Sequence, residues 1–102
     1  MILTSVLYPN DGSTFDFTYY CTKHMDLVHK LLEPYGLIRT EVDKGLGSGA
    51  PGVKPPFVAI GHLYFNTLQE LEQGMKAHDP DLAADLVNFT DIRPTIQINE
   101  IL

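Results

Sequence analysis

Residues 57–65 read Phe-Val-Ala-Ile-Gly-His-Leu-Tyr-Phe, and this stretch decides the fold because it has the strongest β-strand pattern in the chain. Apolar side chains occupy both alternating faces, and the exception is His62. Strands with this pattern are usually covered on both faces, which places them in the interior of a sheet. We therefore predict a sheet in which residues 57–65 form a central strand.

Three further strands are predicted from shorter patterns. Residues 2–8 are rich in β-branched and aromatic types and stop at the turn formers Pro9-Asn10-Asp11-Gly12, while residues 37–44 and 95–101 carry weaker strand patterns. Residues 45–56 contain four glycines and three prolines, which exclude a helix or a central strand. We expect a mobile loop there that could gate a pocket.

Two long helices are predicted from apolar residues at three- and four-residue spacing. The first carries its apolar stripe from Phe17 to Leu32 and ends at Gly36. The second begins at the capping box Thr67–Glu70, in which two side chains satisfy free backbone amides. We expect Gly74 to let this helix lie close to the sheet, and Asp79-Pro80 to start a separate short helix.

Along the chain, these elements follow the order β-α-β-β-α-β. This order is typical of α+β ferredoxin-like domains, which have an antiparallel sheet with both helices on one face. With 102 residues, the chain is expected to form a single domain, residues 1–102. Because the strand patterns are apolar on both faces and the helices cover only one, we predict a homodimer that packs sheet to sheet and closes a barrel.

Composition and charge argue against several classes of protein. Seven Lys and Arg residues against thirteen Asp and Glu residues give a net charge of −6, and no basic cluster is present, which disfavours binding of nucleic acid. The hydrophobic stretches are far shorter than the roughly 20 residues of a membrane span. The N-terminal residues lack a secretory signal, and the single cysteine, Cys21, cannot form an internal disulfide. We expect a cytoplasmic protein with no nucleic-acid or membrane partner.

Two histidines are the candidate catalytic residues. His24 lies in the apolar stripe of the first helix and His62 in the central strand, so both can line one cavity between helix and sheet and act near neutral pH. The alternative is that each is a core side chain satisfied by one hydrogen bond. The spaced pairs of common zinc sites are absent, as are the sequence motifs of nucleotide-binding loops and nucleophile-elbow hydrolases. We therefore expect neither a metal nor a bound cofactor.

Aromatic residues are the candidate ligand contacts. The chain has five tyrosines and five phenylalanines, so that rings would line any cavity and phenol hydroxyls would supply polar recognition. Tyr20, Phe57 and Tyr64 are the predicted substrate-binding residues, and the expected ligand is a small hydrophobic or aromatic molecule. The alternative is that these rings only fill the core.

Three residue strings occur in order along the chain. They are Phe15–Tyr20 followed by Lys23-His24-Met25, then Pro55–Ala59, and finally Asp85 with Asn88–Asp91 before Pro94. Together they resemble the EthD family, named for ethyl tert-butyl ether degradation, over nearly the whole chain. One departure is Asp26, which stands where the family commonly has a proline after the His-Met pair.

The resemblance implies a dimeric α+β barrel and makes His24 the matching histidine. Proteins of that barrel superfamily include cofactor-free monooxygenases, polyketide cyclases, dehydratases and haem-degrading enzymes, which bind flat apolar substrates between sheet and helices. We therefore expect a cofactor-independent oxidoreductase, dehydratase or cyclase, with His24 as general acid or base and His62 or Tyr20 positioning a substrate oxygen. The alternatives are a non-catalytic ligand-binding or accessory dimer and a purely structural dimer.

Overall fold

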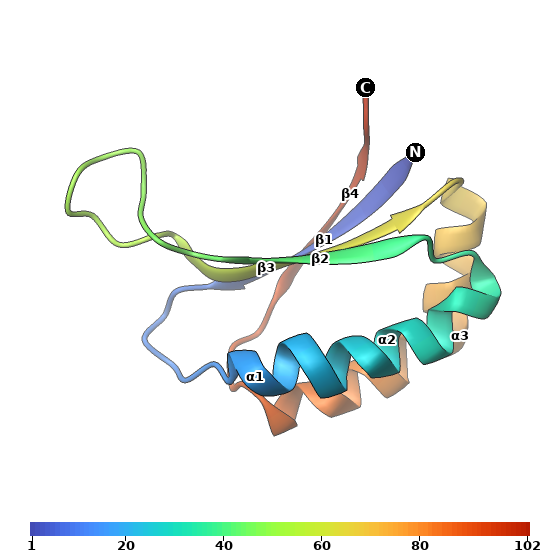
Figure 1. Cartoon of the computed structure of the whole chain (residues 1–102), viewed down its shortest axis with the longest axis horizontal. Coiled ribbons are helices and arrows are strands. Elements are labelled where there is room, and N and C mark those ends of the chain that lie inside the picture. The colour runs from blue at the N-terminus through green and yellow to red at the C-terminus, as the bar shows by residue number, and fades with distance from the viewer.

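A four-stranded antiparallel sheet forms one layer of the computed structural model, which describes residues 1–102, and the helices form a second layer on one of its faces (Figure 1). The strands are β1 (Ile2–Pro9), β2 (Arg39–Lys44), β3 (Phe57–Phe65) and β4 (Thr95–Glu100), in the spatial order β2-β3-β1-β4. The predicted α+β ferredoxin-like fold is confirmed, with residues 57–65 in the interior of the sheet. No helix has the length and apolar character needed to cross a lipid bilayer.

The first helical segment follows the predicted apolar stripe but contains a turn of π-helix. It comprises α1 (Phe17–Tyr19), η1 (Tyr20–His24), α2 (Met25–Leu32) and the 3₁₀ turn η2 (Glu33–Tyr35). π-Helical turns inside α-helices are rare and occur frequently at functional sites. The segment ends as predicted at Gly36, whose φ of 105° is the left-handed conformation that favours glycine after a helix.

The second helix is continuous where a break is predicted. Helix α3 spans Leu68–Asp85, passes through Pro80 and is followed by the 3₁₀ turn η3 (Leu86–Asn88). The predicted short helix starting at Asp79-Pro80 is therefore wrong. Proline removes one backbone donor from a helix, but Pro80 is exposed, so water can satisfy the carbonyl that loses its partner. The buried side chain of Leu82 anchors the helix beyond that point.

Gly74 permits a close approach, although to a different neighbour from the one predicted. A Cβ atom added at Gly74 would lie 3.1 Å from Tyr35 Cβ and 3.2 Å from Leu32 Cδ2. Both atoms belong to the end of the first helical segment rather than to the sheet. Gly74 therefore sets the distance between the two helices, and the expectation of close contact with the sheet is wrong.

The strand register assigns the side chains to two faces, because successive residues of a strand point in opposite directions. We call the face away from the helices the open face. The residues on it are Leu3, Ser5, Leu7, Arg39, Glu41, Asp43, Ile60, His62, Tyr64, Thr95, Gln97 and Asn99. It is more polar than predicted, since the two edge strands supply charged and amide side chains to it. The helices also leave part of the other face uncovered, because Ile96 and Ile98 of β4 are 53% and 51% exposed.

Candidate functional site

A partly buried pair of histidine and carboxylate joins the first helical segment to the end of α3. His24 is 6% exposed, and its Nδ1 lies 2.8 Å from Asp85 Oδ2. The other carboxyl oxygen, Oδ1, accepts hydrogen bonds from the Tyr19 hydroxyl at 2.7 Å and from Asn88 Nδ2 at 2.9 Å. Burial acts to raise the pKa of Asp85, but the hydrogen bonds from Asn88, His24 and Tyr19 outweigh it and lower that pKa. Asp85 is therefore an anion at neutral pH.

The carboxylate fixes which ring nitrogen of His24 is free to react. Ionised Asp85 only accepts hydrogen bonds, so Nδ1 of His24 carries the proton that faces it. The second nitrogen, Nε2, has no hydrogen-bond partner in the protein, and no fully buried side-chain nitrogen or oxygen lacks a partner. Nε2 is thus unpaired and not completely enclosed by the protein, and in the neutral imidazole it is the basic atom.

Aromatic packing and backbone contacts bring the pair together across 61 positions of sequence. The ring of His24 stacks on Tyr20, one turn earlier, with centroids 5.4 Å apart, and its other neighbour is Phe89 at 4.7 Å. The carbonyl of Phe89 accepts the backbone N–H of Asp16 at 2.8 Å, which holds the segment after α3 against the start of the first helix. The same contact places Asp85 beside His24.

A cavity of about 90 Å³ lies between the sheet and the helices, and His24 is part of its wall. Eleven of the fifteen lining residues are hydrophobic, and Ile96 on the half-covered edge strand marks where it reaches the surface. In another protein an apolar cavity of about 150 Å³ accommodates benzene. A ligand of one aromatic ring would therefore have to widen this cavity at the β4 edge. The lining residues are Thr4, Val6, Tyr8, Tyr20, His24, Met25, Val28, Leu63, Met75, Asp79, Leu82, Ala83, Leu86, Pro94 and Ile96.

Two tyrosines give this cavity hydrogen-bond donors. Burial raises the pKa of Tyr8 to about 12, and burial together with the neighbouring Tyr8 raises the pKa of Tyr20 further still. Both phenols therefore keep their protons at neutral pH, and because the two hydroxyls interact with each other, one of them is left to donate to a ligand oxygen. The backbone makes room for Tyr20 at Gly61, where any Cβ atom would collide with the Tyr20 hydroxyl.

The structure brings together two of the predicted site residues and separates the others. His24 and Tyr20 line the cavity, but His62 and Tyr64 lie on the open face, because their neighbour Leu63 points to the cavity. The two histidines therefore do not share a site, contrary to expectation. Phe57, at the start of β3, is half-buried and is not among the lining residues. The catalytic role of His24 remains a prediction.

Asp85 and Tyr19 are site residues to which the sequence analysis assigned no role. Both belong to the strings that resemble the EthD family. The spacing of Asp85 could have indicated its role, because Asp85 lies on the same side of α3 as Leu71, His78 and Leu82. A carboxylate on the buried side of a helix needs a partner, and His24 is that partner.

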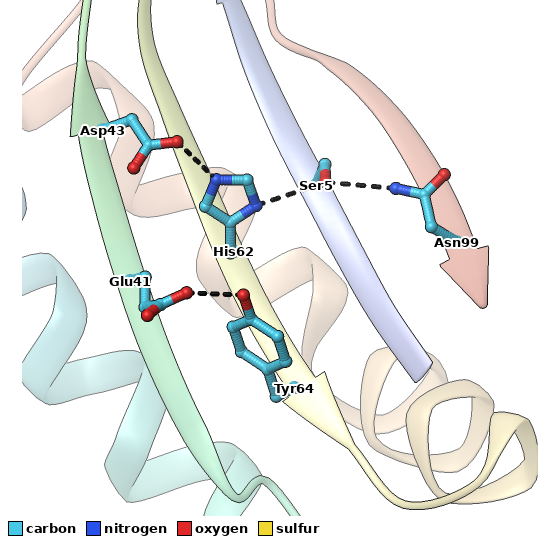
Figure 2. A network of polar contacts seen from close by, with 6 residues as sticks. All are labelled: Ser5, Glu41, Asp43, His62, Tyr64 and Asn99. Atoms are coloured by element: carbon cyan, nitrogen blue, oxygen red, sulfur yellow. Dashed lines mark hydrogen bonds and ion pairs between the residues drawn. The ribbon is translucent and has the colours of Figure 1, made fainter. Parts of the chain in front are cut away.

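His62 belongs to a second polar group, which extends across all four strands on the open face (Figure 2). Its Nε2 lies 2.7 Å from Asp43 Oδ2 and its Nδ1 lies 3.4 Å from Ser5 Oγ. Asn99 Nδ2 donates to the same serine oxygen at 3.3 Å, and the hydroxyl of Tyr64 donates to a carboxylate of β2.

Serine, histidine and aspartate are the residue types of a hydrolase triad, but this group lacks its geometry. The distance of 3.4 Å between Ser5 and His62 is long for a nucleophile and its base. The group is also spread over a sheet surface outside the cavity. Nowhere in the chain do three or more His, Cys, Asp or Glu side chains come together in a way that could hold a metal ion.

Comparison with known proteins identifies relatives of the whole chain. The EthD domain model matches residues 13–93. An EthD-like protein from Ralstonia eutropha JMP134 is 34% identical, with a TM-score of 0.91 over 99% of this chain and 91% of that one. No protein with a curated function is significantly similar to this chain.

More distant solved structures share the fold alone. An ethyl tert-butyl ether degradation (EthD) family protein from Bacillus halodurans C-125 is 22% identical, with a TM-score of 0.77 over 100% of this chain and 99% of that one. A candidate antibiotic biosynthesis monooxygenase from Nitrosomonas europaea is 13% identical, with a TM-score of 0.53 over 100% and 99% of the two chains. The same arrangement of strands and helices thus carries very different sequences.

Proposed function

We propose that this chain, which belongs to the EthD family, binds a small hydrophobic or aromatic molecule in the cavity beside His24 and uses that imidazole as general base or acid. One observation carries the proposal: Asp85 anchors Nδ1 of His24, while Nε2 has no protein partner and the ring forms part of an otherwise mostly apolar wall. The alternative, a core histidine satisfied by its one hydrogen bond to Asp85, predicts no ligand response that depends on His24.

The reaction classes that fit begin with a proton transfer at the substrate. His24 Nε2 would accept a proton from a phenol or from a carbon next to a carbonyl group, and Asp85 would stabilise the imidazolium that results. One of the two paired hydroxyls, those of Tyr8 and Tyr20, would donate to the substrate oxygen that gains charge. Dehydration and cyclisation can start from such a step, and so can oxidation without a cofactor, in which molecular oxygen as co-reactant takes electrons from the substrate anion. The monooxygenase description of the Nitrosomonas europaea protein, which has the same fold, makes oxidation one of the classes to test.

The alternative is a non-catalytic ligand-binding or accessory protein. The small cavity favours it, because about 90 Å³ leaves little room for both a substrate and a second reactant. Turnover separates the two functions, since a binding protein would return its ligand unchanged.

The test is a panel of phenols, hydroquinones and polyketide-like aromatics, assayed by thermal shift and by product analysis. His24→Gln is the informative variant, and His29→Gln is its control because His29 contacts Glu33 and Thr40 outside the cavity. We expect a ligand to raise the Tm of the wild type and of the control but not of His24→Gln. We expect turnover to fall at least 100-fold in His24→Gln. A ligand response that is equal in all three proteins would contradict the proposal.

We also propose that two copies form a homodimer through their open faces. Leu3, Leu7 and Ile60 lie on that face without cover from any helix, and association would remove them from water. One chain has a mass of 11.4 kDa, and light scattering at micromolar concentration should give twice that mass. The mass of a single chain would contradict the homodimer and leave the proposal for His24 to its own test.

A further inference from the structure

We propose that the cavity beside His24 is entered between α3 and β4, and that Asp79 at this mouth favours uncharged molecules over anions. The inference rests on the proposed function, because it names the class of ligand that the same cavity takes. An uncharged phenol or enol belongs to this class, whereas a carboxylate or a phosphate ester does not.

The position of the mouth follows from the exposure of the lining residues. Asp79 and Ala83 lie one turn apart on α3 and are both exposed, and Ile96 on β4 is 53% exposed. The lining residues of the first helical segment are all buried, namely Tyr20, His24, Met25 and Val28. The cavity is therefore closed toward the first helical segment and open between α3 and β4.

The wall of the cavity offers an anion no positive partner. Asp79 is the only Asp or Glu among the fifteen lining residues, and none of them is Lys or Arg. Asp85 places a second carboxylate directly behind the ring of His24, 2.8 Å from its Nδ1. An anion in this mostly apolar space would lose its hydration and would lie between two negative charges. An uncharged molecule avoids both costs.

The charge of Asp79 is not cancelled by an ion pair. Each of the four ion pairs in the chain contains a histidine, and none of them includes Asp79. Lys76 lies one turn earlier on α3, but the two side chains form no ion pair. The carboxylate at the mouth is therefore free to act on a molecule that enters.

Selection of an uncharged ligand agrees with the proton transfer proposed for His24. An uncharged ligand that gives its proton to Nε2 becomes an anion beside the new imidazolium, so that opposite charges form next to each other. A ligand that entered as an anion would become a dianion on the same transfer, close to the carboxylate of Asp85. The cavity therefore suits a ligand whose charge first appears during the reaction.

The effect of Asp79 should be large enough to measure. A unit charge about 8 Å away weakens the binding of an anion by about 2-fold in water and by about 30-fold near a protein surface. The effect should shrink in 1 M salt, where the Debye length is about 3 Å.

Alkylation of His24 tests the inference without a known ligand. Bromoacetamide is uncharged, and bromoacetate is an anion of nearly the same size. A neutral imidazole nitrogen attacks the CH₂ carbon of either reagent, an N–C bond forms, and bromide leaves with the electron pair of the C–Br bond. Peptide mass spectrometry at pH 8 measures the rate at His24. The background is Cys21→Ser, because the exposed thiol of Cys21 would otherwise consume the reagents.

The measured quantity is the rate with bromoacetamide divided by the rate with bromoacetate, relative to the same ratio for free N-acetylhistidine. We expect Asp79→Asn to lower this ratio by about 2- to 30-fold, and Asp79→Lys to lower it further. Asp81→Asn is the control, because it makes the same change in net charge outside the cavity, and it should leave the ratio nearly unchanged. An equal ratio in the background protein and in Asp79→Asn would overturn the inference and leave the proposed function intact.

The same reagents test the position of the mouth. Ala83→Leu should slow both alkylations of His24 by at least about 10-fold, because the larger side chain must first move aside. Ala84→Leu is its control, because Ala84 is also exposed on α3 but does not line the cavity. Equal rates in the two variants would overturn this entry route. If neither reagent reaches His24 in the background protein, the inference is overturned, while the ligand panel decides the proposed function separately.

Discussion

Replacing Asp85 with asparagine should move the ring proton of His24 from Nδ1 to Nε2, while the side chain at position 85 keeps nearly the same shape. The carboxylate accepts three hydrogen bonds, from His24, Tyr19 and Asn88. Asparagine keeps one acceptor oxygen but turns a donor toward Nδ1 of His24, so Nδ1 must become the acceptor and Nε2 must take the proton. Bonds to charged groups contribute about 1.5–3 kcal/mol and neutral ones about 0.5–1.5 kcal/mol. We therefore expect a net loss of about 2 kcal/mol, which lowers Tm by roughly 8–16 °C in a domain of this size.

The loss should depend on pH in a defined direction. The pKa of Asp85 is lowered in the folded protein, so its contribution to stability is present above the ordinary carboxyl pKa of about 3.9 and disappears as pH falls through the folded value. The gap in unfolding free energy between wild type and Asp85→Asn should be widest near pH 7 and should narrow below about pH 4. Urea denaturation at pH 7 and pH 3 measures it.

The assay of the mechanism is ¹⁵N NMR of the histidine ring nitrogens, which reports the tautomer of His24 directly. The control is Asp81→Asn, because Asp81 is exposed and pairs with His78 of the same helix at 3.0 Å, away from His24. If Asp85→Asn were as stable as this control at pH 7 and kept the proton of His24 on Nδ1, then Asp85 would not be the group that orients His24.

Two further substitutions test the packing around the site. Gly61→Ala should displace the Tyr20 hydroxyl and lower the unfolding free energy by about 1–3 kcal/mol. Gly49→Ala is the control, because no atom lies within 4 Å of the added Cβ, and it should change the unfolding free energy by less than about 0.5 kcal/mol. Equal Tm values for the two variants would refute the proposed crowding at Gly61. Pro80→Ala should raise the unfolding free energy by about 1–2 kcal/mol, because it restores a backbone donor to the carbonyl of Lys76. A lower unfolding free energy in chemical denaturation would show instead that the proline is required.

The fold followed from the sequence because β3 and the capping box at Thr67 are local signals that tertiary packing did not oppose. The break predicted at Pro80 is the instructive error. If the helix is predicted to end at Pro80, Asp85 is assigned to a separate short helix. Its spacing with the buried positions of α3 is then not seen, and neither is its contact with His24. Whether a helix continues through a proline depends on the exposure of the carbonyl four residues earlier and on the packing of the residues that follow. Neither can be predicted from the neighbouring sequence alone.

The side of the sheet on which His62 lies shows a different limit. Alternation along β3 groups His62 with Ile60 and Tyr64, but it does not say which group faces the helices when both groups contain large apolar residues. Ala59 and Gly61 hold the decisive clue, because small residues leave room for a side chain that comes down from a helix, and Tyr20 occupies that space. Side-chain size along a strand was thus more informative here than hydrophobicity.

Strand β4 connects the two proposals, because its alternate residues belong to different surfaces. Ile96 lines the cavity and is half-covered, while the next residue, Gln97, lies on the open face. β4 is an edge strand that pairs only with β1, so it can shift more readily than the interior strands. A partner over Gln97 would restrain that movement and with it the width of the cavity mouth. Ligand binding near His24 should therefore change the affinity of the two copies for each other, and association should change the affinity for the ligand by the same factor, because coupled equilibria are reciprocal.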